Sequence, residues 1–366
     1  MLKRKPADVA PLVASPPAAH RPPLTAKRKP ADVALHVAAP PAAHRPPLTA
    51  KRKAAGVALV VALLVVALAT ILVAALLDRG ELALARTRNG LRAEQAEAYA
   101  QGLDAYATQV LMLRSDADTA ASPWAQPMPP QMLPDGLVTA SMRDLNGCFN
   151  LNNLSPDAVA RASWQPVFAR LLTALGIDAR VQTAIEDWLD PAKLTSAEAN
   201  AYLAQSVPYR PRGGLFAHVS ELRLVRGIDG AMYARLAPHV CALPIGTRIN
   251  VNTASVPVLQ ALLGPGTTVA VAQALWQNGQ AHWTSVQEFW QATPSRGAAP
   301  GSDGLVDVNS SAFLARGDIV LDGVPFTVFR LILAPINGRV QVVQRSRGAD
   351  DALLGAAPID SAAATR

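Results

Sequence analysis

The chain has 366 residues, 50% of them hydrophobic and 17% charged, which is enough for two or three domains and excludes a mini-protein that needs disulfides to fold. The net charge of +7 comes from residues 1–56, which carry 11 of the 34 basic and 2 of the 27 acidic side chains. Residues 57–366 therefore hold 23 basic and 25 acidic side chains, a net charge of −2, and lack the basic surface of a nucleic-acid-binding protein.

Residues 1–56 form a basic, proline-rich leader that repeats itself. The segment KRKPADVA at 3–10 recurs at 27–34, and AAHRPPLTA at 18–26 recurs at 42–50, so the period is 24 residues. Eleven prolines and few residues able to form a core predict a disordered segment with no folded role, a duplicated or over-extended start of the chain. A nucleic-acid-binding arm is the alternative.

Residues 57–77 form an apolar run in which Thr70 is the only polar side chain. As a helix this run is about 32 Å long, enough to cross a bilayer. A basic segment at 51–53 precedes it, so the positive-inside rule places the N-terminus in the cytoplasm and everything after residue 77 across the membrane. A buried core helix is the alternative, and the lack of a polar face argues against it.

The helical pattern continues beyond the membrane edge. Residues 81–113 contain no proline, are rich in Ala, Leu, Arg, Glu and Gln, and place apolar side chains at helical spacing. We therefore expect one helix over 57–113, half in lipid and half amphipathic, which ends before Ser122-Pro123. Such a helix is either a plain single-pass anchor or the N-terminal helix of a type IV pilin-like subunit.

Alternating apolar and polar residues predict strands on both sides of the central part of the chain. Residues 137–145 suit one strand, and residues 305–346 suit three or four antiparallel strands. The turns are expected at Gly317, Asp322-Gly323 and Asn337-Gly338. We expect residues 114–149 and 301–346 to form one sheet with the long helix on one face. Residues 347–366 are expected to be a disordered tail.

The residues between these strand segments, about 150–300, have helical periodicity and form an insertion in the predicted sheet. FNLNNL at 149–154 and INVNTA at 249–254 open two similar lobes, about 150–245 and 249–300, in which Asn side chains cap the helices that follow. Helix signals occur at 155–157 (a start), 167–177, 195–203, 219–225, 231–239, 256–263 and 269–277.

The sequence contains no motif of an enzyme. The six histidines form no HExxH pair, three of them lie in the leader, and there is neither a Walker A loop nor a GxSxG elbow. We therefore predict a non-enzymatic protein without catalytic residues.

Cys148 and Cys241 both follow the predicted span, on the side of the membrane where disulfides form and persist. Each lies shortly before one of the Asn-rich lobe openings, and neither has a nearby His or Cys that would complete a zinc site. We predict a disulfide between them, and two buried free thiols are the alternative.

The junction at Gly56 distinguishes between the two interpretations of the long helix. A short basic run ends in Gly56 and is followed at once by the apolar segment, as at a prepilin peptidase site, whereas a secretory signal peptide has a shorter core with a small-residue cleavage motif behind it. Cleavage there makes Val57 the first mature residue and Val61 the fifth. Most pilins have a glutamate at the fifth position that pairs with a neighbouring subunit's N-terminal amine, and a subunit at the tip has no neighbour for it.

The chain resembles the minor pseudopilin K family of type II secretion systems, the general secretion pathway K proteins, whose members lack that glutamate. The resemblance covers roughly residues 51–346. Its motifs are WAQPMPP at 124–130, DLNGCFNLNNL at 144–154, DWLD at 187–190, PYRPRGGLFAHVSELRLVRGI at 208–228 and INVNTASVPVLQALL at 249–263.

This resemblance implies an α+β, type IV pilin-like fold, in which a long N-terminal transmembrane helix packs on an antiparallel sheet, with a large inserted all-α domain of two SAM-like or helix-hairpin-helix-like lobes. It also implies cleavage and methylation by prepilin peptidase, a single-pass inner-membrane anchor with the C-terminal domain in the periplasm, and a place at the tip of a pseudopilus. The implied partners are other minor pseudopilins and the inner-membrane platform of the secretion system.

Calcium binding through acidic residues is a further implication of the resemblance. This chain keeps Asp187, Asp190 and Glu198 of the family pattern but has Ala192 and Ala199 where the pattern has further acids. Calcium takes six or more oxygen ligands, several of them from carboxylates. We therefore expect no required cofactor, and at most a weak calcium site at these three residues.

The alternative function is that of a membrane-anchored periplasmic DNA-binding protein, as in competence receptors. Residues 221–240 and 249–264 resemble helix-hairpin-helix units, which often hold a DNA backbone through hairpin amides. Charge argues against this function, because duplex binding depends on several Lys and Arg contacts, and residues 57–366 have a net charge of −2 with Lys193 as the only lysine. We expect these helix pairs to pack protein and not to bind nucleic acid.

Overall fold

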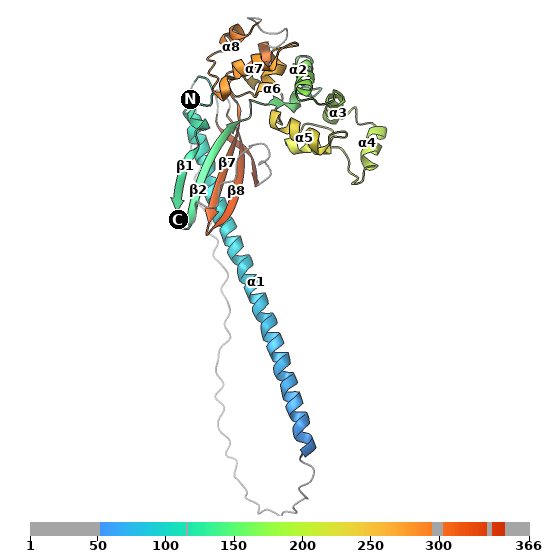
Figure 1. Ribbon diagram of the computed structural model, residues 1–366, viewed down its shortest axis with the longest axis vertical. Helices are drawn as coiled ribbons and strands as arrows, with labels where there is room; N and C mark the ends of the chain where they lie inside the picture. The colour runs from blue at the N-terminus through green and yellow to red at the C-terminus, as the bar shows by residue number, and fades with distance from the viewer. Residues whose placement is uncertain (1–51, 115, 295–302, 335–338, 348–366) are drawn as a thin grey trace, which may run out of the picture. The chain divides into compact units, whose positions relative to one another are not determined.

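The computed structural model describes residues 52–114, 116–294, 303–334 and 339–347 (Figure 1). Residues 1–51 of the leader predicted to be disordered, the predicted tail after residue 347 and the turn at Asn337-Gly338 lie outside the described residues, whereas residues 52–56 of the leader are helical. The chain divides into two compact units, residues 1–75 and residues 76–366. The first unit consists, in its described part, of the beginning of helix α1. The second unit holds the rest of α1, the strands and the other helices.

Helix α1 runs from Arg52–Met112 without interruption, as the continuous periodicity predicts, and it begins five residues before the expected start. Within it, residues from Gly56 on form one helix that is long and apolar enough to cross a membrane, judged by length and composition. The large apolar side chains between Val57 and Leu77 are 53–69% exposed. Such a surface requires lipid or another protein to cover it.

A five-stranded antiparallel sheet lies in the second unit, with the strand order β1-β2-β7-β8-β9. The strands are β1 (Met128–Leu133), β2 (Gly136–Asp144), β7 (Ala312–Leu321), β8 (Val324–Leu333) and β9 (Gln341–Arg347). Strand β2 pairs with β7 along its whole length, from Gly136 opposite Leu321 to Asp144 opposite Phe313. The expected pairing of an early strand with the C-terminal strands is therefore confirmed.

Two features of the sheet differ from the sequence prediction. Strand β1 was not predicted. It contains Pro129 and Pro130 and lies at the edge of the sheet, where missing amide donors cost no ladder hydrogen bond. The turn predicted at Gly317 is wrong, since this glycine lies inside β7. A Cβ there would lie 3.0 Å from a side-chain carbon of Leu103, so the glycine permits close packing of α1 on the sheet. The predicted turn at Asp322-Gly323 is confirmed, with φ angles of 47° and 76°.

The second half of α1 covers one face of this sheet (Figure 1). Its buried side chains recur at helical spacing and are mostly small, which lets the helix axis approach the strands. They are Ala96, Ala100, Leu103, Ala107 and Leu111. Opposite them lie inward side chains of alternate strand positions, Phe313, Ala315 and Ile319 of β7 and Val328 and Ile332 of β8.

The remaining helices lie in the chain between β2 and β7. They are α2 (Arg161–Ala174), α3 (Arg180–Leu189), α4 (Ser196–Leu203), α5 (Gly230–Leu236), α6 (Val256–Leu262), α7 (Val269–Trp276) and α8 (Val286–Ala292). The segment predicted at 219–225 forms a 3-10 helix, Val219–Leu224, and the predicted 231–239 divides into α5 and a 3-10 turn. Helices α3 and α8 were not assigned from the sequence. The helix start expected at 155–157 is wrong, because Ala158 N donates to Ser155 O in a turn and α2 begins only at Arg161.

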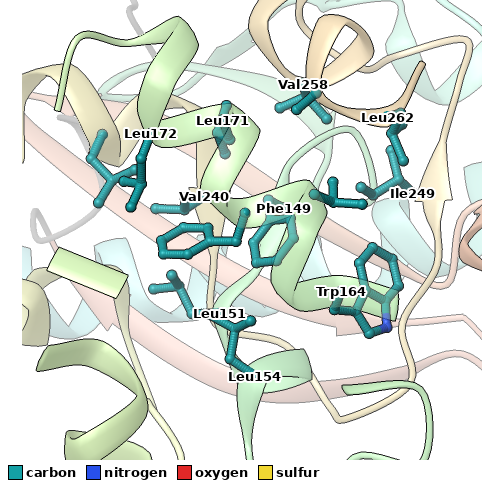
Figure 2. Close-up of a cluster of buried hydrophobic side chains, with 14 of the residues drawn as sticks. Phe149, Leu151, Leu154, Trp164, Leu171, Leu172, Val240, Ile249, Val258 and Leu262 are labelled. Carbon is teal, nitrogen blue, oxygen red and sulfur yellow. The ribbon is translucent and has the colours of Figure 1, made fainter. Parts of the chain in front are cut away.

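In each half of this helical region, a short strand at the beginning pairs in parallel with a short strand at the end. Strand β3 (Phe149–Asn150) pairs with β4 (Val240–Cys241), and β5 (Ile249–Asn250) pairs with β6 (Val306–Asp307). The two halves, which we call lobe 1 (149–241) and lobe 2 (249–307), share one core (Figure 2). Its members include Phe149, Leu151, Trp164, Leu171, Leu172, Val240, Ile249, Val258 and Leu262. The rings of Phe149 and Trp164 are nearly perpendicular, with 5.6 Å between their centroids.

Candidate functional site

The residues predicted for processing lie near the start of α1. Gly56 is inside the helix, and no described atom lies within 4 Å of the position that a Cβ would take there, apart from the helix's own backbone. Val57 and Val61 are both exposed, with 65% and 53% of their surface accessible. These three residues therefore present an apolar helix face without a carboxylate at position 61.

A charged cluster attaches the second half of α1 to the sheet. The side chain of Arg330, on β8, is only 1% exposed, and its Nε and Nη2 donate to Asp104 at 2.7 Å and to Glu97 at 3.2 Å. Asp104 also pairs with Arg345, and Glu97 with Arg347, both at 2.8 Å. Because two acids one helical heptad apart meet arginines of β8 and β9, the cluster fixes the register of α1 on the sheet.

Replacing Arg330 with methionine is expected to lower the free energy of unfolding by about 3 kcal/mol, the lower end of the range for breaking a buried ion pair, because Arg345 and Arg347 still compensate the two acids. Denaturant unfolding of the full chain in detergent would measure the change. The matched control is Arg347→Ala, which removes a 64% exposed partner and should cost less than about 1 kcal/mol. Equal effects of the two substitutions would contradict the assigned role of Arg330.

A disulfide joins Cys148 to Cys241, with 5.8 Å between their Cα atoms. Both residues are buried, and they pack with Leu145, Leu243 and Phe329 on the sheet face that α1 leaves open. Cys241 belongs to β4 and Cys148 directly precedes β3, so the bond closes lobe 1 where its parallel strand pair meets the sheet.

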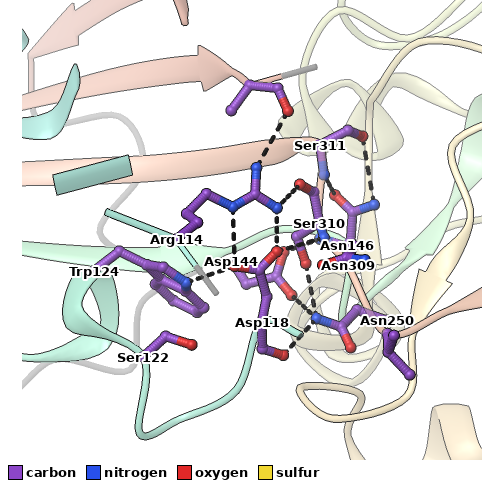
Figure 3. Close-up of polar contacts among 12 residues, drawn as sticks. Arg114, Asp118, Ser122, Trp124, Asp144, Asn146, Asn250, Asn309, Ser310 and Ser311 are labelled. Atoms are coloured by element: carbon purple, nitrogen blue, oxygen red, sulfur yellow. Dashed lines mark hydrogen bonds and ion pairs between the residues drawn. The ribbon is translucent and has the colours of Figure 1, made fainter. Parts of the chain in front are cut away.

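A second polar cluster lies at the point where lobe 2 meets the sheet (Figure 3). We call it the junction cluster, and its members are Asp118, Asp144, Asn146, Asn250, Thr253 and Ser310. Asp118 is fully buried and accepts hydrogen bonds from Trp124 Nε1 and from the Ser310 amide, both at 2.8 Å. Arg114, two residues after the end of α1, forms an ion pair with Asp118.

Asp144, the last residue of β2, is the second carboxylate of the junction cluster. It accepts hydrogen bonds from the Asn146 amide at 2.7 Å, from Asn250 Nδ2 at 3.3 Å and from the Thr253 hydroxyl. Burial raises the pKa of Asp144 to about 6, although its hydrogen bonds act in the opposite direction, and the negative charge of Asp118 adds a small increase. One carboxylate of the sheet therefore binds the first residues of lobe 2.

Two asparagines occupy equivalent positions in the two lobes and make long-range contacts. Asn152 accepts from the Phe216 amide at 2.8 Å and donates to the Phe216 carbonyl at 3.0 Å. Asn252 does the same with Trp283, at 2.7 Å and 3.0 Å. Capping was the predicted role of the asparagines in these two segments. Asn150 caps the 3-10 helix that follows it, and Asn250 Oδ1 accepts from the Asn252 amide at 2.9 Å, but neither α2 nor α6 has an asparagine cap. The sequence signal that could have revealed these long-range contacts is a repeated pattern, FxxVxEL at 216–222 and WxxVxEF at 283–289.

The acidic residues considered for calcium are not gathered into a site. Asp187 lies on α3 and Asp190 directly follows it, where its side chain accepts from the Ala192 amide at 2.9 Å. Glu198, on α4, forms an ion pair with Arg226 at 3.1 Å. Among the described residues no group of three or more His, Cys, Asp or Glu side chains could hold a metal ion. Burial and the negative charge of Glu198 raise the pKa of Asp187, so the two carboxylates are near enough to interact, and calcium binding at these residues stays a prediction.

Of the two segments that resemble DNA-binding hairpins, residues 221–240 carry a carboxylate at a helix start. Asp229 Oδ1 accepts from the Met232 amide at 2.7 Å. Backbone amides at such a helix start are the groups through which these hairpins bind phosphate. Because an aspartate already occupies this amide and repels anions, the geometry disfavours a phosphate backbone at this hairpin.

Comparison with known proteins gives consistent matches over the folded part of the chain. Residues 147–245 match the family T2SSK_1st and residues 249–309 match the family T2SSK, both described as "Type II secretion system (T2SS), protein K". The chain is 33% identical over 309 residues to the type II secretion system protein K of Pseudomonas aeruginosa, covering 79% of this chain and 91% of that protein. It is 32% identical over 317 residues to the protein K of Pectobacterium carotovorum subsp. carotovorum, covering 79% and 94%.

A solved structure supports the same relationship at the level of the fold. The chain is similar to a chain in the crystal structure of the GspK-GspI-GspJ complex from the type 2 secretion system of enterotoxigenic Escherichia coli. The TM-score is 0.62 at 28% identity, and the match covers 72% of this chain and 99% of that chain.

Proposed function

The chain belongs to the protein K family of type II secretion systems, and on this premise we propose that it is a non-enzymatic minor pseudopilin that caps the tip of a periplasmic pseudopilus. Its fold is then that of a type IV pilin-like subunit, with α1 and the five-stranded sheet as the pilin part and lobes 1 and 2 as an inserted helical domain. The GspK-GspI-GspJ complex supports other minor pseudopilins as its partners.

The observation that carries the tip position is the exposed valine at position 61. In a helix whose first half is apolar and exposed, a glutamate at the fifth mature position would pair with the N-terminal amine of the subunit above. Val61 carries no such charge, and a subunit with no neighbour above it has no amine with which a glutamate could pair. The width of lobes 1 and 2 supports the same position, because a large insertion at each step along a filament would separate neighbouring sheets.

The remaining parts of the proposal concern the membrane and processing. The long apolar helix fits a single-pass inner-membrane anchor, and we infer a periplasmic location for residues 78–366 from the basic segment at 51–53. Prepilin peptidase then cleaves after Gly56, and the inner-membrane platform of the secretion system receives the mature helix. A buried disulfide supports the oxidising periplasm.

Periplasmic DNA binding is the weaker candidate. The net charge of −2 over residues 57–366 leaves little electrostatic attraction for a phosphate backbone. In the hairpin at residues 221–240, Asp229 already occupies a backbone amide that would bind it. Protein packing is therefore the better use of the helical lobes.

Immunogold labelling of pseudopili tests the tip position. Wild-type protein is expected only at filament ends, and Val61→Glu should leave the labelling and the secretion rate unchanged, because a tip subunit has no amine above it. Insertion should survive, since an acidic residue costs about 3 kcal/mol at mid-bilayer and less one turn inside the helix. Val61→Leu is the control for a change of side-chain size. Labelling along the shaft with Val61→Glu would overturn the tip assignment.

A further inference from the structure

Arg143, on β2, is a partly buried arginine whose guanidinium forms no hydrogen bond and no ion pair with any described residue. Some side-chain nitrogens in the described part of the chain are buried without a partner, for example Arg161 Nε, but none of these belongs to Arg143, so its nitrogens stay accessible. Burial lowers the pKa of Arg143, and the charge of the adjacent Asp144 offsets only part of this effect. The guanidinium has therefore lost water without gaining a carboxylate partner.

Arg143 lines a pocket between lobe 1 and the sheet face that α1 leaves open. The pocket has a volume of about 40 Å³, about three times the room that one water molecule needs, which suits a group of the size of a carboxylate. Most of the lining is apolar and comes from β2, β7, β8 and lobe 1. Its polar side chains are donors or neutral groups, and no described residue that lines it is acidic. These polar residues are Arg143, His218, Gln344 and Ser346.

The carboxylates of the neighbouring elements already have donors. Asp144 is held by the amide and hydroxyl groups of the junction cluster. Glu221, in lobe 1, accepts from the Ala217 amide at 2.8 Å, and Asp318, on β7, pairs with Arg316 at 2.8 Å. A carboxylate for Arg143 must therefore come from outside the described residues.

The C-terminal segment contains the nearest such carboxylates along the chain. Ser346 lines the pocket, the described residues end at Arg347, and Asp350 and Asp351 follow Ser346 by four and five positions. An extended chain spans about 13 and 17 Å over these distances, and the arginine side chain adds to this reach. Residues 295–302 and 335–338, which also lie outside the described part, contain no acidic side chain.

We propose that the pocket at Arg143 is a carboxylate-binding site and that Asp350 or Asp351 of the C-terminal segment occupies it. A guanidinium and a carboxylate form charge-assisted hydrogen bonds, which are among the strongest that side chains make. Docking of the segment links the end of β9 to lobe 1 and closes the gap between lobe 1 and the sheet. The proposal does not depend on the position of the protein in a filament.

Fluorescence anisotropy of the full chain in detergent tests this proposal. Both native cysteines are joined in a disulfide, so Ala352→Cys introduces a single free thiol, next to the two acids, for a bimane label. We expect the label to be restricted in this labelled parent. Arg143→Gln, or Asp350→Asn with Asp351→Asn, should each lower the docking equilibrium constant about tenfold or more and lower the anisotropy accordingly, because each removes the charge-assisted hydrogen bond.

Two further variants show whether the effect is specific to the pair. Arg212→Gln changes a 60% exposed arginine of lobe 1 that does not line the pocket, and it should leave the anisotropy unchanged. Exchange of the charges, Arg143→Glu with Asp350→Arg and Asp351→Arg, should restore the anisotropy. The same anisotropy in the labelled parent and in Arg143→Gln would overturn the proposal, and a loss that the exchange does not reverse would contradict a direct pair.

Propionate separates the C-terminal segment from a second protein as the source of the carboxylate, because it has the carboxylate and the short apolar chain of a glutamate side chain. In saturation-transfer NMR it should bind the variant with Asp350→Asn and Asp351→Asn more tightly than the wild type, in which the segment competes, and it should not bind Arg143→Gln. Equal binding to the first two proteins would leave the pocket to a partner's carboxylate and overturn the assignment to the segment. Absence of binding to the Asn variant would overturn the carboxylate site itself.

Discussion

Removal of the Cys148–Cys241 disulfide is expected to lower the free energy of unfolding by about 4–5 kcal/mol, the largest stability change that we predict for this chain. The two cysteines are separated by 93 residues, so the reduced chain regains the conformational freedom of a long loop when it unfolds. A loss of this size approaches the whole stability of a typical domain, and lobe 1 should lose its attachment to the sheet first.

Denaturant unfolding of the full chain in detergent, under oxidising conditions, compares the wild type with the double variant Cys148→Ala/Cys241→Ala. Both positions are buried, so alanine also loses some packing, and the wild type treated with reductant separates the two effects. Reductant should weaken the wild type and leave the double variant unchanged. Free alkylation of both thiols in the native, unreduced protein would contradict the pairing, and mass mapping without reduction would identify the joined peptides directly.

The parts of the fold that could be predicted from the sequence are those with a regular hydrophobic period. The continuous helical pattern after residue 57 predicted α1, and alternation at 137–145 and 305–346 predicted β2 and the C-terminal strands. Both signals are local, because burial of one face repeats along a single element. The turn at Asp322-Gly323 was predictable for a similar reason, since its two residues adopt the left-handed conformation.

The features that could not be predicted depend on contacts between distant residues. Gly317 was taken for a turn because a sequence does not show that Leu103, more than 200 positions earlier, packs against it. Strand β1 contains two prolines, and only its place at the sheet edge makes them acceptable.

The polar sites were the least predictable part of the molecule. Arg330 occupies an inward position of the alternating strand β8, which from the sequence is a conflict with burial, and the resolution lies in Glu97 and Asp104 on α1. Asp144 was noted only as part of a family motif, since nothing near it in the sequence indicates that Asn250 and Thr253 surround it. A charged residue at a core position of a periodic element is thus a signal for a partner, although not for its identity.

Replacement of Gly56 by leucine is expected to abolish maturation of the protein. Prepilin peptidases accept essentially only glycine before the cleaved bond, so the variant should keep its leader and migrate as the heavier precursor. The wild type should begin at Val57, which N-terminal sequencing or the intact mass of the purified protein would establish.

The structure allows this experiment to separate processing from folding. No described atom outside the backbone of α1 lies within 4 Å of a Cβ at Gly56 or at Gly80, which lies further along the same helix, so leucine fits at both positions. In a helix, leucine is also favoured over glycine by somewhat less than about 1 kcal/mol, so neither substitution should disturb α1. Gly80→Leu is therefore the matched control and should mature normally.

Normal maturation of Gly56→Leu would place the cleavage site elsewhere, and Val61 would then not be the fifth residue of the mature chain. If only Gly56→Leu remains unprocessed, cleavage depends on the glycine between the leader and the apolar helix. The mature subunit then has valine, and not glutamate, at its fifth position.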